Sequence, residues 1–120
     1  MPKKTILIVE DESLSAISLA SYLEDLGHRV LDFPTTGREA IAIAEADRPD
    51  IVFMDVSLPG DMDGIEAARI INELAPVALI FMTGYANKSV TERAAALKPV
   101  AYLIKPFDFA LIDGILDSIG

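Results

Sequence analysis

The chain has 120 residues, of which 52% are hydrophobic and 24% are charged, so residues 1–120 have the length and apolar content of one compact domain. It has no cysteine, which excludes disulfides and thiolate chemistry, and no apolar run near the roughly 20 residues that span a bilayer. The net charge of −9 argues against direct binding to nucleic acid or an anionic membrane, because both attract cations. The first apolar run ends at Val9, short of a signal-peptide core of about 7–15 residues, so we expect a cytoplasmic protein.

Short apolar runs alternate along the chain with segments of helical spacing, which predicts βα units around a parallel sheet. In chain order the predicted elements are a strand at Ile6–Val9, a helix ending near Leu26–Gly27, a strand at Arg29–Phe33, a helix at Gly37–Ala46, a strand at Ile51–Met54, a helix at Gly64–Leu74, a strand at Val77–Met82, a helix at Asn87–Leu97, a strand at Val100–Ile104 and a helix at Phe107–Ile119. The third strand does not alternate with polar residues, as expected of a strand covered on both faces. The fold class is therefore α/β, with a doubly wound five-stranded parallel sheet.

Helical spacing also predicts which side chains face the core. The inward residues are expected to be Ile17, Ala20 and Leu23 in the first helix, Ala40, Ile41 and Ala44 in the second, Val90, Ala94 and Leu97 in the fourth, and Ile112, Ile115 and Ile119 in the last. His28 is the only histidine and follows a glycine at a helix end, so we interpret it as a surface residue without a partner.

Reactive side chains follow four of the five predicted strands. They are Glu10, Asp11 and Glu12 after the first strand, Asp55 after the third, Thr83 after the fourth and Lys105 after the fifth. Ligands of open parallel sheets bind at the carboxyl ends of the strands, and a strand order of 2-1-3-4-5 would place these four ends side by side. Crowded carboxylates repel one another unless they hold a hard cation such as Mg²⁺, which prefers oxygen ligands. Beside such a metal, Asp55 could act as a carboxylate nucleophile toward phosphorus.

Four segments resemble the receiver domains of response regulators in two-component phosphorelay signalling, the family that includes the bacterial chemotaxis regulator. The segments are ILIVEDE, IVFMDVSLPG with MDGIEAAR, FMTGY and AYLIKPF, and the match covers essentially the whole chain. The resemblance implies a flavodoxin-like (βα)5 fold with strand order 2-1-3-4-5. It also implies a signalling domain, not an enzyme, that takes a phosphoryl group from a histidine kinase or a phosphotransfer protein.

The same resemblance implies the residues of the phosphorylation site. Asp55 matches the phospho-accepting aspartate. Asp11 matches the acid that ligates Mg²⁺ directly, and Glu10 the acid that usually reaches the metal through water. Ser57 falls where the family contributes a backbone carbonyl to the metal, for which Mn²⁺ is an expected substitute.

Four further residues match the family's response to phosphorylation. Thr83 matches the hydroxyl that moves to bond the phosphoryl group, and Lys105 the lysine that pairs with it. Tyr102 falls at the aromatic position whose ring then turns inward, and Pro106 at the proline whose preceding bond is usually cis. The output surface implied is the face of the fourth helix, fifth strand and fifth helix, which binds a downstream partner or supports a weak, phosphorylation-dependent dimer of an otherwise monomeric protein.

Two stretches depart from the common family pattern. The loop LPGDMDG has one residue more than the common LPGMDG, and Asp61 is the expected extra residue, which leaves the shape of the loop beside Asp55 open. Lys98–Pro99 stands where many receivers have Gly-Ala, so we expect a stiffer turn before the fifth strand.

Other interpretations of these residues fit the sequence less well. The carboxylates Glu10–Glu12 could simply be a solvated strand end beside a helix N-terminus. A phosphohydrolase of the haloacid-dehalogenase kind would need Asp-x-Asp after the first strand, whereas here Asp55 follows the third strand and Ser57 stands in place of the second acid. A flavin carrier would need a phosphate-binding loop after the first strand, where the three acids would repel the phosphate. DMDG lacks the further acids of a calcium loop. A pseudo-receiver that binds partners without phosphorylation keeps the same fold and is the alternative function.

Overall fold

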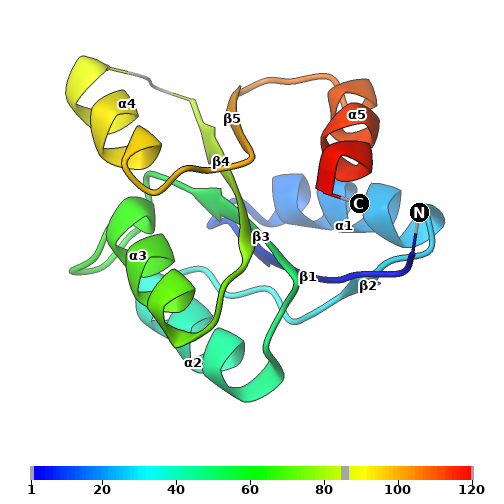
Figure 1. Cartoon of the computed structure of the whole chain (residues 1–120), viewed down its shortest axis with the longest axis horizontal. Coiled ribbons are helices and arrows are strands. Elements are labelled where there is room, and N and C mark those ends of the chain that lie inside the picture. The colour runs from blue at the N-terminus through cyan, green and yellow to red at the C-terminus, as the bar shows by residue number, and fades with distance from the viewer. Residues whose placement is uncertain (1, 85–86, 120) are drawn as a thin grey trace.

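The structure, a computed structural model, describes residues 2–84 and 87–119. Strands and helices alternate along these residues, as predicted, and the chain winds from one face of the sheet to the other (Figure 1). The elements are β1 (Thr5–Val9), α1 (Ser13–Asp25), β2 (Arg29–Val30), α2 (Gly37–Asp47), β3 (Ile51–Asp55), α3 (Gly64–Leu74), β4 (Ala78–Thr83), α4 (Lys88–Ala95), β5 (Ala101–Ile104) and α5 (Ala110–Ile119).

The five strands form one parallel sheet in the order β2-β1-β3-β4-β5, which confirms the predicted topology. The winding direction reverses between β1 and β3, and ligand sites of such sheets lie at that switch point. Val9 pairs with Met54, Asp55 with Met82 and Thr83 with Ile104. The carboxyl ends of β1, β3, β4 and β5 therefore meet at one edge of the sheet.

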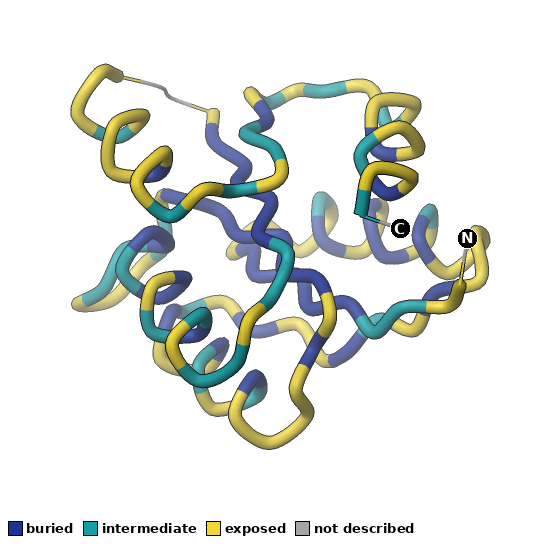
Figure 2. The backbone as a smooth tube through the Cα atoms, viewed as in Figure 1, coloured by how far each residue is buried: buried dark blue, intermediate teal, exposed yellow. Residues whose placement is uncertain are grey.

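Two layers of hydrophobic side chains cover the sheet, one on each face. α1 and α5 lie on one face and α2 and α3 on the other (Figure 1), and the strands between them are mostly buried (Figure 2). Successive side chains of a strand point to opposite faces, so Ile8 of β1 packs under α1 and α5, whereas its neighbour Val9 packs under α2 and α3. Phe53 and Met54 of β3 divide in the same way, and every residue of β3 is buried. Burying a large apolar side chain stabilises the fold by roughly 1.5–3 kcal/mol, which explains the continuous apolar run of β3.

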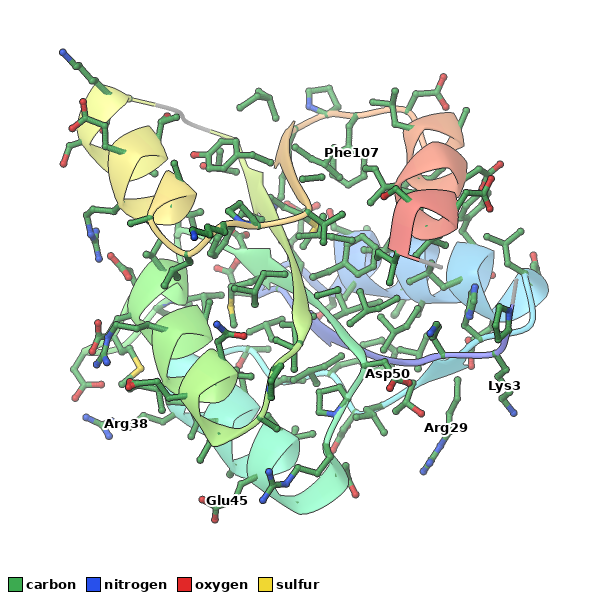
Figure 3. All side chains as sticks on the ribbon, in the orientation of Figure 1. Lys3, Arg29, Arg38, Glu45, Asp50 and Phe107 are labelled. Atoms are coloured by element: carbon green, nitrogen blue, oxygen red, sulfur yellow. The ribbon has the colours of Figure 1, made fainter. Side chains whose placement is uncertain are left out.

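Two hydrogen bonds at the amino ends of β1 and β3 hold these neighbouring strands in register. The Asp50 Oδ2 atom accepts a hydrogen bond from the Thr5 N–H at 2.8 Å, and the Asp50 N–H donates to the Thr5 carbonyl at 2.8 Å (Figure 3 labels Asp50). Because both strands start in step, Glu10 and Asp55 end beside each other.

Side-chain caps begin three of the helices. Thr36, Asp63 and Asn87 each accept a hydrogen bond from the backbone N–H three residues later, which satisfies a donor that the helix itself leaves unpaired. No helix within residues 2–84 and 87–119 is long and apolar enough to cross a membrane.

The predicted bounds are right for α3. They are too long for β2, α4, β5 and α5, one residue too short for β1, α2 and β3, and one residue too early for β4. The second strand covers only Arg29–Val30, because this edge strand pairs on one side alone before the chain turns toward α2. α4 lacks the predicted end residues Asn87 and Leu97, of which Asn87 is the cap. α5 begins at Ala110, whose N–H is capped by the Asp108 carboxylate at 2.9 Å.

Two predictions about single side chains are wrong. Ile17 was expected to face the core, but it is 55% exposed, and α1 buries Ala16 and Leu19 together with the correctly predicted Ala20 and Leu23. His28 was interpreted as a surface residue, but it is buried, and its Nδ1 atom accepts a hydrogen bond from the Lys4 N–H at 3.0 Å. The N-terminal segment folds over the imidazole, which local sequence does not reveal.

Candidate functional site

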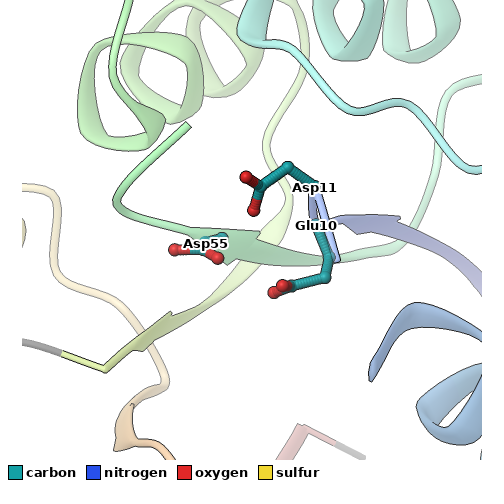
Figure 4. A group of neighbouring side chains, drawn as sticks. All are labelled: Glu10, Asp11 and Asp55. Atoms are coloured by element: carbon teal, nitrogen blue, oxygen red, sulfur yellow. The ribbon is translucent and has the colours of Figure 1, made fainter. Parts of the chain in front are cut away.

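Three of the predicted site residues bring carboxylates together at the carboxyl edge of the sheet. Glu10 follows β1 directly, Asp11 follows Glu10, and Asp55 is the last residue of β3 (Figure 4). Each offers an oxygen within 4.8 Å of the oxygens of the other two. Glu10 and Asp55 are 3% and 4% exposed, whereas Asp11 faces solvent. A cluster with two buried acids and one open acid leaves a path for a small ion to enter.

Asp55 is held in a fixed orientation by two donors. Its Oδ1 atom accepts a hydrogen bond from the Ser57 N–H at 2.9 Å, and its Oδ2 atom accepts one from Lys105 Nζ at 2.8 Å. Ser57 stands in the loop between β3 and α3, so the loop supplies a backbone donor to the carboxylate. Buried carboxylates require such partners, because desolvating an ionised group is costly.

Lys105, directly after β5, bridges two of the three acids. Its Nζ atom donates to Asp55 and also to Glu10, at 2.5 Å. Burial raises the pKa of the Glu10 carboxyl, and the nearby Asp55 acts in the same direction against the opposing Lys105. Burial disfavours the charged Lys105, but its bonds with Asp55 and Glu10 outweigh that effect and raise the pKa of the ammonium. The ammonium therefore stays charged within the cluster at neutral pH.

The other predicted residues occupy neighbouring strand ends. Thr83 ends β4 and is fully buried, and its carbonyl accepts a hydrogen bond from the Lys105 N–H at 2.7 Å. The Tyr102 ring packs against the hydrophobic layer of α2 and α3, with its centroid 6.4 Å from that of Phe81. The Tyr102 hydroxyl is buried, and no partner for it lies among the described residues. The bond between Lys105 and Pro106 is cis. Tyr85, the last residue of the FMTGY segment, lies outside the described residues.

Glu12 does not join the cluster, although it belongs to the same run of acids. Its Oε1 atom accepts a hydrogen bond from the Ser15 hydroxyl at 2.7 Å, and its backbone N–H donates to Glu10 Oε1 at 3.2 Å. The three consecutive acids therefore lie in different surroundings: Glu10 is buried, Asp11 faces solvent, and Glu12 turns to α1. A solvated strand end accounts for Glu12 but not for the buried Glu10.

Sequence reasoning missed the glycine on which the backbone geometry depends. A Cβ atom on Gly64 would lie 1.9 Å from the Asp55 carbonyl oxygen, far inside contact distance. The Gly64 N–H also donates to the Val56 carbonyl at 2.9 Å. The first residue of α3 therefore lies directly against the backbone of Asp55, the last residue of β3. The Asp63–Gly64 pair before an apolar helical run was the available signal, since a capping residue was visible there.

Asp61, which was expected to be the extra residue of the loop, has a structural partner. Its carboxylate accepts from Arg38 of α2, with Nη2 to Oδ2 at 2.7 Å and Nε to Oδ1 at 3.0 Å. Both side chains are about two-thirds exposed, so this pair adds little stability and mainly ties the loop to α2.

The donor set fits a hard divalent cation. Carboxylate oxygens are the ligands that Mg²⁺ prefers, and three of them converge here from two strand ends. Of the three acids, Glu10 also lines a mostly apolar cavity of about 380 Å³ between α1 and the segment after β5, together with Lys105, Phe107 and Phe109. Phe107 lies between β5 and α5 in Figure 3.

Comparison with known proteins gives a consistent family. The family model described as response regulator receiver domain matches residues 6–117. The chemotaxis protein CheY of Thermotoga maritima is 30% identical over 118 residues, which cover 98% of each chain. The transcriptional regulatory protein PdtaR of Mycobacterium tuberculosis is 36% identical over 107 residues, which cover 89% of this chain and 52% of PdtaR. The chain thus spans about half the length of PdtaR.

Solved structures show the same likeness in three dimensions. The CheY-like response regulator receiver domain protein from Methanospirillum hungatei has a TM-score of 0.89 at 29% identity, covering 98% of this chain and 94% of that one. The signal receiver domain of a modulated diguanylate cyclase from Desulfovibrio desulfuricans has a TM-score of 0.92 at 33% identity, covering 98% and 94%.

Proposed function

Because the chain belongs to the response-regulator receiver family, we propose that it is a receiver that accepts a phosphoryl group on Asp55 from a histidine kinase or a phosphotransfer protein. The observation that carries the proposal is the position of Asp55. Its carboxylate is buried at the end of the central strand, clustered with Glu10 and Asp11 and bonded to Lys105. In this proposal residues 1–120 act as one receiver domain in the cytoplasm.

The reaction follows from the groups around Asp55. A carboxylate oxygen forms a bond to phosphorus while the bond from phosphorus to the donor's histidine nitrogen breaks, and the imidazole leaves with the electron pair. The product is an acyl phosphate on Asp55. The Ser57 N–H fixes the orientation of the carboxylate at the end of β3. Burial of Asp55 and Glu10 limits water near the phosphoryl group.

Charge neutralisation is shared among the remaining groups. Glu10, Asp11, Asp55 and the backbone carbonyl of Ser57 would hold Mg²⁺, or Mn²⁺ in its place, and the bound metal would neutralise charge on the phosphoryl oxygens. The Lys105 ammonium, which donates to Asp55 here, lies within reach of those oxygens once Asp55 is modified.

The output step rests on two strand-end residues. Thr83 turns its hydroxyl to the phosphoryl group and Tyr102 adjusts with it, which shifts a two-state equilibrium on the face made by α4, β5 and α5. That face, in this proposal, contacts a downstream domain or protein, or a second copy in a weak dimer. The buried Tyr102 hydroxyl, without a partner among the described residues, supports a side chain that has more than one position.

Intact mass spectrometry after incubation with acetyl phosphate and Mg²⁺ tests the proposal. We expect one phosphoryl adduct on the wild type, and none on Asp55→Asn or after chelation of the metal. Asp11→Asn should form the adduct much more slowly, because it removes a metal ligand. Glu12→Gln is the matched control and should form the adduct as fast as the wild type, because Glu12 lies outside the cluster.

Absence of an adduct under every condition would overturn the proposal, provided that a short-lived adduct is excluded with beryllofluoride, a stable phosphoryl mimic. A protein that binds neither Mg²⁺ nor beryllofluoride would instead be a phosphorylation-independent interaction module.

A further inference from the structure

α4 is held to the rest of the molecule by few buried contacts. Ala94 is its one buried residue, and Val90 is partly buried against the layer of α2 and α3. Its N-terminal cap comes from its own neighbour Asn87, so the cap does not attach it to another element. A helix with so little buried surface is easily displaced, and any further attachment has a large relative effect on its position.

An ion pair supplies such an attachment. The Arg93 guanidinium of α4 donates to the Asp63 carboxylate with two nitrogens, Nη1 to Oδ2 at 2.8 Å and Nη2 to Oδ1 at 3.3 Å. The side chains are 48% and 36% exposed, so both are partly withdrawn from solvent. A two-pronged guanidinium–carboxylate contact fixes orientation as well as distance, which a single lysine bond does not. Burial opposes ionisation of Asp63, but Arg93 and the Glu66 N–H outweigh it and lower the pKa of the carboxyl.

Asp63 is in turn joined rigidly to the backbone of the phosphorylation site. Its Oδ1 atom caps α3 by accepting from the Glu66 N–H at 2.9 Å. The next residue, Gly64, lies against the Asp55 carbonyl so closely that a Cβ atom there would be 1.9 Å from the oxygen. A shift of the Asp55–Ser57 backbone must therefore move the start of α3, and with it the carboxylate that holds Arg93.

We propose that the Asp63–Arg93 ion pair couples the backbone beside Asp55 to the position of α4, so that Arg93 is a positioning residue for the phosphorylation response. The inference rests on the proposed function for the signal and on the observed contacts for the route. It gives α4 a connection to the site through the loop between β3 and α3, separate from the chain connection that follows β4. Because coupling between two sites is reciprocal, the position of α4 also affects how readily the site accepts its ligand.

The first test needs no ligand. Amide hydrogen exchange over residues 88–95 should become about two- to fivefold faster in Arg93→Gln, the range expected for a partly exposed ion pair. Asp63→Asn keeps a capping oxygen for α3 and should give the same increase, and the double variant should add nothing further. Lys88→Gln is the matched control, because it removes the same charge from α4 without touching Asp63. It loses only the exposed contact with Glu92 at 4.0 Å, so its exchange should stay close to that of the wild type.

The second test uses Mg²⁺ with beryllofluoride, followed by backbone NMR. In the wild type we expect shifts around residues 55–57 and over α4, and in Arg93→Gln the shifts over α4 should fall at least twofold while those around 55–57 persist. Arg93→Lys should restore part of the α4 response. Full-sized α4 shifts in Arg93→Gln, or equal exchange rates in Arg93→Gln and Lys88→Gln, would overturn the coupling. A wild type that does not respond to the mimic contradicts the proposed function, and the exchange experiment then judges the ion pair alone.

Discussion

At the scale of single residues, one ammonium group controls the electrostatics of the strand-end cluster. Lys105 Nζ donates to both Glu10 and Asp55, which are also candidate metal ligands. The same side chain therefore stabilises the crowded acids and repels an incoming divalent cation. These two effects predict opposite consequences of its removal for protein stability and for metal affinity.

We expect Lys105→Met to bind Mg²⁺ at least about fivefold more tightly than the wild type, because two unit charges 4 Å apart interact by ~1 kcal/mol in water and ~4 kcal/mol at an effective dielectric constant of 20. Without Mg²⁺ the variant should be less stable, since its two buried carboxylates lose their counter-ion. Isothermal titration calorimetry and urea unfolding at pH 7.5 measure the two quantities. Lys88→Met is the control, because Lys88 is exposed on α4 and should leave both nearly unchanged. Weaker Mg²⁺ binding by Lys105→Met would show that Lys105 is not a competitor of the metal.

At the scale of elements, the packing of α3 against the end of β3 depends on a residue without a side chain. We expect Gly64→Ala to destabilise the protein by about 1–3 kcal/mol, because the new Cβ would overlap the Asp55 carbonyl and force the backbone apart. Phosphorylation by acetyl phosphate should slow as well, since the same backbone carries the acceptor. Urea unfolding and intact mass spectrometry measure the two effects.

Gly114→Ala is the matched control for that substitution. Gly114 lies inside α5, and a Cβ atom there meets nothing within 4 Å. Alanine should therefore stabilise this helix by roughly 0.5–1 kcal/mol. Equal effects of the two substitutions would mean that the close approach of Gly64 to Asp55 is absent in solution.

The turns after two helices contain residues in the left-handed conformation, Arg48 with φ 48° and Lys98 with φ 52°. A residue with a side chain is disfavoured there by about 1–2 kcal/mol relative to its usual conformation. The left-handed conformation at Lys98 therefore favours glycine, the residue that many receivers have at this position. Lys98→Gly should stabilise the protein by about 0.5–1 kcal/mol, less than the strain because glycine also gains freedom in the unfolded chain.

Arg48→Gly should be neutral or destabilising in the same urea-unfolding experiment. The Arg48 guanidinium donates to the carbonyls of Glu45 and Leu74 at 3.2 and 3.1 Å, and these bonds tie the end of α2 to the end of α3. Equal stabilisation by both glycines would show that the two Arg48 bonds contribute nothing.

At the scale of the whole molecule, the buried His28 makes stability depend on pH. Burial lowers the pKa of the imidazole below its ordinary value of 6.5, and the charge of Lys4 acts in the same direction. The unfolded chain therefore binds a proton more readily than the folded chain. Above about pH 7.5 His28 is neutral in both states and does not lower the stability of the fold. As the pH falls from about 6.5 through the lower folded-state pKa, stability is lost because the unfolded chain takes up the proton first.

We expect the wild type to lose more unfolding free energy between pH 7.5 and 5.5 than His28→Gln, which cannot take up the proton. Urea unfolding without Mg²⁺ at the two pH values measures the difference. The comparison between variants matters, because the raised pKa of Glu10 contributes to both proteins in the opposite direction. An equal loss in both proteins would mean that His28 is free to protonate in the fold.

Most of the fold could be predicted because its signals are local. The apolar run of β3 and the exact bounds of α3 follow from spacing and caps that lie within a few residues. The edge strand β2 was overestimated, since an edge strand pairs only with its one neighbour, β1, and its own residues do not record where that pairing stops. Ile17 was misplaced for a related reason: a four-residue buried stripe on α1 passes beside it.

The candidate site was predicted in its members but not in its pairings. Asp55, Glu10 and Asp11 could be grouped because parallel strands deliver their carboxyl ends to one edge. Glu12 turns to Ser15 because of where α1 starts. Lys105 bridges Glu10 as well as Asp55 because of the path of β5. Neither follows from spacing along the chain.

The class of fold and the strand ends that carry reactive groups could be read from the amino-acid sequence, and the order of the strands followed from the family resemblance. These follow from periodicity and from turn residues, which act over short distances along the chain. Which side chains meet is known only from the folded structure. Examples are Arg93 with Asp63 across 30 residues, His28 beneath Lys4, and Gly64 against the Asp55 carbonyl. Such contacts depend on how helices sit on the sheet, and that placement is a property of the whole core rather than of any one segment.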